Sequence, residues 1–185
     1  YLKADENLVR KWDRELPKNK VRIGFSWRSQ LNHGVRKLGY TQLGQWEPLL
    51  SNPKFSFINL QYGDIDEDIN AVPTNLSENL FLPKIDLKND LENVAAIIDN
   101  CDFVIAPGNA VLQQAAAMGK PTITYVTADG AYFLGRKLDF YKASRHPFLS
   151  NNYSICYNPS KKDEIPRLVE NKLQNLCQIT EDLNI

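Results

Sequence analysis

The loop that follows the first predicted strand carries the residue types that bind an anion. From Arg28 to Trp46 the sequence contains no Asp or Glu. Its cationic side chains are Arg28, Arg36 and Lys37, and His33 is a further basic candidate in the same loop. Guanidinium and ammonium groups neutralise a phosphate by charge and by hydrogen bonds. A solvated surface loop can have the same composition, so this loop indicates an anion site only in combination with a second feature.

That second feature is a tight turn that leads into a helix. An apolar strand ends at Ala106, Pro107-Gly108-Asn109 makes the turn, and a helix begins at Ala110. The first amides of a helix have no intrahelical acceptor and carry the positive end of the helix dipole. They hold a phosphate without a charged side chain, and small residues permit its close approach. The sequence therefore predicts a diphosphate site at the amides of Gly108, Asn109 and Ala110.

Polar side chains at two strand ends are further candidates for contact with a phosphate or a sugar. Ser26 closes the first predicted strand, and Gln61 closes the second. The carboxyl ends of parallel strands lie at one edge of a sheet, where ligands bind. An acidic run follows, with no His beside it, so we interpret it as a solvated helix start and expect no metal. Its members are Asp64, Asp66, Glu67 and Asp68.

Motifs and composition exclude several classes of function. The sequence has neither G-x-G-x-x-G nor G-x-x-x-x-G-K-[ST], which disfavours NAD-type and P-loop sites. It also lacks H-E-x-x-H and G-x-S-x-G. The 22 Lys and Arg residues balance the 22 Asp and Glu residues, which argues against a nucleic-acid partner. No apolar run approaches the ~20 residues of a membrane span.

The cysteines and the first residues bear on the compartment. Cys101, Cys156 and Cys177 are odd in number and far apart, which is typical of small buried side chains in a reducing compartment. The first twenty residues lack the apolar centre of a signal peptide. We therefore expect a cytoplasmic protein. Because the chain opens on Tyr1 rather than Met, we also expect a domain of something longer.

Apolar segments of strand length alternate with segments of helical period, which predicts the fold class. Strands that are apolar on both faces and separated by helices form a mainly parallel sheet in a three-layer α/β/α Rossmann-like domain. The predicted strands are 21–27, 55–60, 79–82, 103–106 and 122–126, and the predicted helices lie at 8–16, 42–50, 91–98 and 110–118. Residues 1–185 then form one domain, in which 1–20 is a helix or linker from a preceding domain and 160–185 is a closing helix.

Two helices carry explicit expectations about their ends and faces. Asp90 is expected to cap its helix. Its apolar face is expected to consist of Leu91, Val94, Ala95 and Ile98. At the end of helix 110–118, Gly119 is expected at the position that favours glycine.

Three segments together resemble a known family. They are VRIGFSWR at 21–28, WEPLL at 46–50 with FINLQYGD at 57–64, and NAV at 109–111 with AAAMGKP at 115–121. In this order they resemble the carboxyl-terminal half of GT-B glycosyltransferases. The particular resemblance is to heptosyltransferase-like domains attached to tetratricopeptide repeats in bacterial proteins. It extends from about Val21 to about Pro159, which is most of the chain.

The resemblance implies the donor-binding half of a glycosyltransferase that takes a sugar from a nucleoside diphosphate, without metal or cofactor. The turn at 107–110 would cradle the diphosphate, and Arg28, Arg36 and Lys37 would neutralise the leaving nucleotide. Ser26 and Gln61 would contact phosphate or sugar. The acceptor and often the catalytic base would come from an amino-terminal domain, with tetratricopeptide repeats as further parts of the same protein.

Two positions depart from the family pattern. Heptosyltransferases commonly carry an Asp-Thr-Gly-type turn followed shortly by His, whereas this sequence has Gly108-Asn109-Ala110 at the turn and Gln113 in place of the His. The acidic contact to the donor sugar is therefore missing, and a heptose donor is not expected. Two alternatives stay open: a non-catalytic interaction module that keeps the fold, and a nucleotide-sugar epimerase that converts the donor without an acceptor.

Overall fold

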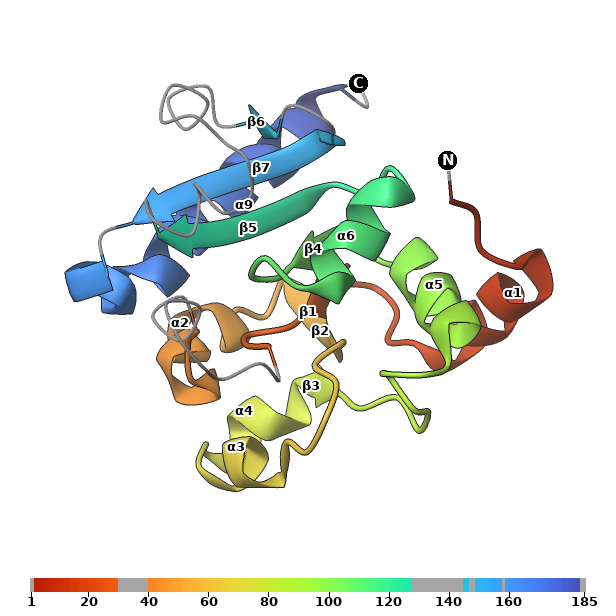
Figure 1. Ribbon diagram of the computed structural model, residues 1–185, viewed down its shortest axis with the longest axis horizontal. Helices are drawn as coiled ribbons and strands as arrows, with labels where there is room; N and C mark the ends of the chain where they lie inside the picture. The colour runs from red at the N-terminus through yellow and green to blue at the C-terminus, as the bar shows by residue number, and fades with distance from the viewer. Residues whose placement is uncertain (1, 30–39, 128–144, 147–148, 158, 184–185) are drawn as a thin grey trace.

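A seven-stranded sheet forms the centre of the molecule (Figure 1). The computed structural model describes residues 2–29, 40–127, 145–146, 149–157 and 159–183. The strand order is β3-β2-β1-β4-β5-β7-β6, with every pair from β3 to β7 parallel and β6 antiparallel at one edge. The strands are β1 (Val21–Phe25), β2 (Phe55–Asn59), β3 (Leu80–Phe81), β4 (Phe103–Ile105), β5 (Thr122–Thr127), β6 (Arg145–His146) and β7 (Leu149–Tyr157). The mainly parallel sheet predicted from the sequence is confirmed.

Helices cover both faces of this sheet and complete a three-layer α/β/α arrangement. One face carries α1 (Glu6–Glu15), α5 (Leu91–Asp99) and α6 (Ala110–Ala117). The opposite face carries the 3₁₀ helix η2 (Leu43–Trp46), α2 (Glu47–Leu50) and α9 (Ile165–Leu183). Two short helices, α3 (Asp66–Asn70) and α4 (Thr74–Glu78), follow β2, and the 3₁₀ helix η3 (Pro159–Glu164) precedes α9. None of the helices in this described part is long and apolar enough to cross a membrane.

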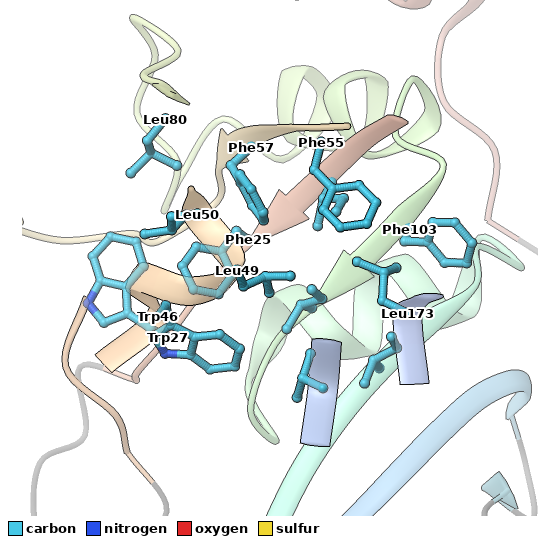
Figure 2. Packing of buried hydrophobic residues seen from close by; sticks show 14 of the residues in the cluster. Phe25, Trp27, Trp46, Leu49, Leu50, Phe55, Phe57, Leu80, Phe103 and Leu173 are labelled. Carbon is cyan, nitrogen blue, oxygen red and sulfur yellow. The ribbon is translucent and has the colours of Figure 1, made fainter. Parts of the chain in front are cut away.

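Aromatic side chains dominate the core on the α2 and α9 face (Figure 2). The ring of Phe25 lies 5.0 Å from that of Trp46 and 5.9 Å from that of Phe57, both edge to face. The ring of Trp27 also lies 5.6 Å from the ring of Phe25. Such pairs add about 0.5–1.5 kcal/mol each beyond the burial of their area. This packing fixes the end of β1, from which the loop with the candidate ligand contacts departs.

The other face is packed so closely that β1 leaves little room for a side chain at Gly24. A Cβ atom at Gly24 would lie 2.6 Å from Leu60 Cδ1 and 3.2 Å from Val104 Cγ2. The Sγ atom of Cys101 would be 3.3 Å away. Burial raises the pKa of the Cys101 thiol to about 12. This cysteine is therefore a buried, protonated side chain of the core, as its sequence context predicted.

Helix α1 is part of this packed face. Trp12 and Leu16 are each 2% exposed. The Trp12 Nε1 donates to Asn93 Oδ1 at 2.7 Å, which joins α1 to α5. The Arg22 guanidinium donates to Asp13 Oδ1 at 2.8 Å, which joins α1 to β1. Residues 6–15 thus pack as an element of the α/β/α unit.

Two helix predictions need correction. The face of α5 was predicted to include Leu91 and Ala95, but Leu91 is 58% exposed, and Ala96 and Ile97 are buried instead. The buried side of α5 is therefore the side that packs against the sheet and α1. The predicted helix 42–50 is a 3₁₀ turn followed by one α-helical turn, with Pro48 near the junction.

Other predicted boundaries are confirmed. Asp90 caps α5 through its side chain, which accepts from the Asn93 amide at 3.2 Å. Gly119 has φ +78° directly after α6, in the left-handed region that favours glycine. The strand β7 was not predicted, because Ser150, Asn151, Asn152 and Ser154 interrupt its apolar pattern.

Candidate functional site

The direction in which the sheet grows reverses between β1 and β4. From β1 the chain proceeds through β2 to β3 on one side, and from β4 through β5 to β7 on the other. Ligands of doubly wound sheets bind beyond the carboxyl ends of the strands at such a point. The segments that meet there are 26–29, after β1, and 106–109, between β4 and α6.

Asn109 joins these two segments. It is the N-cap of α6, where its Oδ1 accepts a hydrogen bond from the Leu112 amide at 3.2 Å. Its Nδ2 donates to Ser26 Oγ at 2.9 Å and to the carbonyl oxygen of Arg28 at 3.3 Å. The side chain is 7% exposed. The first turn of α6 is therefore fixed against the segment after β1.

Gln61 holds the same segment from the side of β2. Its Oε1 accepts from Ser26 Oγ at 3.1 Å and from the amides of Trp27 and Arg28 at 3.1 Å and 2.9 Å. Its Nε2 donates to the carbonyl oxygen of Tyr62 at 3.1 Å. Ser26 and Gln61 are 0% and 1% exposed. The polar atoms of the Gln61 side chain thus bond inside the protein and shape the loop.

A third set of hydrogen bonds holds this loop at the carbonyl oxygen of Trp27. This oxygen accepts from Thr41 Oγ1 at 3.0 Å and from Tyr125 Oη at 2.9 Å. The indole Nε1 of Trp46 donates to Thr41 Oγ1 at 2.8 Å and ties this group to η2. The indole Nε1 of Trp27 itself is buried and has no hydrogen-bond partner among the described residues.

The Arg28 side chain points toward α3. Its Nε and Nη2 donate to Asp68 Oδ2 at 3.1 Å and 2.7 Å, and Nη2 also donates to the carbonyl oxygen of Asp64 at 2.7 Å. The Arg28 and Asp68 side chains are 29% and 19% exposed. Three residues of the acidic run form the first turn of α3, as predicted, and two of them, Asp66 and Glu67, are exposed. Asp68 is the exception, because it is the counter-ion of Arg28.

The start of α6 offers backbone donors. The Asn109 amide donates to the Pro107 carbonyl oxygen at 2.7 Å. Within the described part of the chain, the amides of Gly108, Ala110 and Val111 have no acceptor. Gly108 and Ala110 are exposed. Free amides at the positive end of a helix dipole are suited to an anion.

The structure brings most of the predicted site residues together. Ser26, Gln61 and Asn109 form one buried network, and Gly108 and Ala110 lie beside it at the start of α6. Gln113 is exposed on the same helix. Arg36, Lys37 and His33 lie outside the described residues. Across the parts of the chain that the structure describes, no group of three or more His, Cys, Asp or Glu side chains is placed to hold a metal ion.

Sequence reasoning missed three residues that shape the site: Thr41, Tyr125 and Asp68. Thr41 lies in the loop after β1 itself, and nothing in the sequence indicated that it and Tyr125 would both bond the Trp27 carbonyl oxygen. For Asp68 a signal was present, since an acidic run follows β2 in the neighbouring loop and Arg28 is the first cation after β1.

Comparison by sequence finds one substantial relative. No protein-family model matches the chain. Protein FlbA of Caulobacter vibrioides is 32% identical to it over 158 residues, a match that covers 84% of this chain and 26% of FlbA. The chain therefore spans about a quarter of the length of this curated relative.

Comparison by structure finds glycosyltransferases. The E. coli ADP-heptose lipopolysaccharide heptosyltransferase II superposes with a TM-score of 0.68 at 15% identity, over 97% of this chain and 54% of that one. The E. coli heptosyltransferase WaaC with ADP gives 0.55 at 15% identity, over 94% and 50%. A family 9 glycosyltransferase of Veillonella parvula gives 0.56 at 12% identity, over 85% and 42%. The chain thus has a GT-B-like Rossmann fold of the glycosyltransferase kind and spans about half of such a protein.

Proposed function

We propose that this chain is the donor-binding domain of a glycosyltransferase and binds a nucleoside-diphosphate sugar at the carboxyl ends of β1 and β4. The observation that carries the proposal is the fixation of the α6 N-terminus by Asn109 at the point where the sheet reverses direction. The amides at that end of α6 are held in position before any ligand arrives, ready to donate hydrogen bonds to a diphosphate. Preorganised donors of this kind stabilise charge as it develops on a leaving group.

Two comparisons support this proposal. The structure of WaaC was obtained with ADP, a nucleoside diphosphate. This chain covers about half of each heptosyltransferase that it resembles, which is what one of the two domains of a GT-B enzyme would cover. We propose that residues 1–185 form the carboxyl-terminal domain, as the resemblance of the sequence segments implies. The acceptor site, the catalytic base and tetratricopeptide repeats would belong to other parts of the protein.

Each residue of the site has a proposed role. The amides of Gly108, Ala110 and Val111 bind the diphosphate, whereas the predicted Asn109 amide does not, because it already donates to the Pro107 carbonyl oxygen. Arg28, Arg36 and Lys37 neutralise the charge of the diphosphate. Ser26, Gln61 and Asn109 act through the backbone by holding both loops in place, since their side chains are already hydrogen-bonded to each other. Gln113 contacts the sugar. In this mechanism the departing diphosphate is stabilised directly, and no covalent intermediate is needed.

Binding of the donor by this chain is testable. Calorimetric titration with UDP, GDP, ADP and CDP and their sugar conjugates is expected to identify one nucleotide that binds. The double variant Arg36→Ala/Lys37→Ala is expected to bind that nucleotide at least tenfold more weakly, while Lys18→Ala/Lys20→Ala, with the same change in charge, serves as the control. Absence of binding by every nucleotide contradicts the proposal.

A non-catalytic interaction module is the second candidate, and one observation favours it. The buried polar groups at the site are used within the protein, and Arg28 is neutralised by Asp68. A domain that had lost its donor would retain such a network for stability alone. Under this alternative the nucleotide titrations show no binding, and the domain instead binds a protein partner.

A further inference from the structure

Arg28 divides its contacts between two sides of the site. Its carbonyl oxygen accepts from Asn109 and so faces α6. Its guanidinium extends the other way, to Asp68 on α3 and to the carbonyl oxygen of Asp64. The backbone of Arg28 therefore lies beside the proposed diphosphate site. Its side chain, which carries the one described cation in the loop after β1, extends away from that site toward α3.

The Arg28–Asp68 pair is more than a surface ion pair. Both Arg28 nitrogens that reach the carboxylate contact the same oxygen, Asp68 Oδ2, at 3.1 Å and 2.7 Å. Both side chains are more than two-thirds covered, so solvent screens the interaction less than it does between exposed charges. Because the Asp68 carboxylate already balances the charge of the guanidinium, an incoming anion gains little electrostatic attraction from it. The anion must compete with Asp68 for Arg28.

We propose that Asp68 sets the affinity of the diphosphate site by competing with the bound anion for Arg28. This inference rests on the proposed function, because it concerns the same anion site. In the ligand-free state Asp68 and the Asp64 carbonyl hold Arg28. When the diphosphate binds, the guanidinium exchanges the carboxylate for a phosphate oxygen, and the cost of breaking the ion pair weakens binding. Asp68 is thus a residue that tunes affinity without touching the ligand.

The test is a set of calorimetric titrations on the 185-residue chain with pyrophosphate and with the nucleoside diphosphate that binds best. Asp68→Asn keeps an oxygen for Arg28 and removes the charge. Asp66→Asn is the matched control, because it makes the same change in charge on the same helix at an exposed residue. Both substitutions are then repeated with Arg28→Gln. Circular dichroism of each variant verifies folding.

The expected result is that Asp68→Asn tightens binding about three- to tenfold at low salt, and that Asp66→Asn changes it less than about twofold. With Arg28→Gln present, the two substitutions are expected to have equal, small effects, because no guanidinium remains to be released. The gain from Asp68→Asn should also shrink as salt is raised to about 0.5 M.

Three outcomes overturn the inference. Unchanged or weaker binding by Asp68→Asn shows that Arg28 is not the object of competition. An equal gain with and without Arg28 shows that Asp68 acts by simple repulsion of the anion. Failure of the original chain and of every variant to bind any ligand removes the anion site itself, and with it the proposed function. The first two outcomes leave the proposed function intact.

Discussion

The side-chain amide of Asn109 donates a hydrogen bond to the hydroxyl of Ser26 at 2.9 Å, across 83 positions of the sequence. The same side chain caps α6 through its oxygen, which accepts from the Leu112 amide. One residue thus ends the turn after β4, begins a helix, and attaches that helix to the strand beside it. The geometry of the proposed anion site depends on both halves of this carboxamide.

Replacing Asn109 tests this double role. Asn109→Ala removes the cap and the bond to Ser26, and is expected to lower the free energy of unfolding by about 2–3 kcal/mol, measured by urea denaturation. Asp90→Ala is the matched control, since Asp90 also caps a helix, α5, and its side chain bonds Asn93 rather than the segment after β1. It is expected to cost about 1 kcal/mol and to leave nucleotide binding unchanged. Equal losses of stability in the two variants would contradict a special role for Asn109.

Replacing Gln61 tests the loop after β1. Gln61→Met fills a similar volume but leaves the donors of Ser26, Trp27 and Arg28 without their acceptor. Each buried donor without an acceptor costs about 1–3 kcal/mol, so the free energy of unfolding is expected to fall by at least about 2 kcal/mol. The exposed Gln113→Met should change it by less than about 0.5 kcal/mol. Similar denaturation midpoints for the two variants would argue that Gln61 does not hold the loop.

The close approach at Gly24 predicts a packing effect. Gly24→Ala introduces a methyl group 2.6 Å from Leu60 Cδ1, which is expected to destabilise the protein by about 1–3 kcal/mol. Adding Leu60→Val removes that Cδ1 atom and should recover part of the loss. Gly44→Ala is the control, because its nearest neighbour is 3.7 Å away. Thermal unfolding of these three variants and of the original chain measures the effect, and an unchanged stability of Gly24→Ala is the contrary result.

The ion pair between α1 and β1 predicts a dependence of stability on pH. The hydrogen bond from Arg22 lowers the pKa of the Asp13 carboxyl from its ordinary value of 3.8. The folded state therefore holds the proton less tightly than the unfolded state. The stabilisation is fully present above pH 3.8 and is lost as the pH falls through the lower pKa of the folded state.

Asp13→Asn should accordingly be less stable than the original chain at neutral pH, with the difference vanishing in acid. Urea denaturation from about pH 7 to about pH 2.5 measures this. Glu15→Gln removes the same charge from the same helix and is expected to show no comparable trend. A difference between Asp13→Asn and the original chain that stays constant into acid would contradict the assignment.

Local sequence was sufficient to predict the centre of the fold. The apolar runs of β1, β2, β4 and β5 are buried on both faces of a parallel sheet, so their pattern is nearly continuous. The turn into α6 and its end at Gly119 are also local, because a cap and a positive φ depend on neighbouring residues. These features were predicted correctly for that reason.

Features decided by distant parts of the chain were not predicted. Strand β7 carries a polar sequence and is a strand because it pairs with β5 over six residue pairs. Leu91 is exposed because α5 presents Ile97 and Ile98 to the sheet and α1 instead. The inward orientation of Gln61 and the pairing of Arg28 with Asp68 depend on how three loops meet. Periodicity along the sequence contains no information on tertiary contacts between loops.

The central position of β1 beside β4 has a consequence for how the protein acquires its fold. Residue Ile23 pairs with Phe103, and the site combines groups from Ser26 to Leu112. Contacts between such separated segments require closure of a long loop, which slows folding. During synthesis the strand β1 must therefore wait for β4 to be made. The proposed anion site and the middle of the sheet both need residues of β1 and β4, so a chain released before β4 is made has neither.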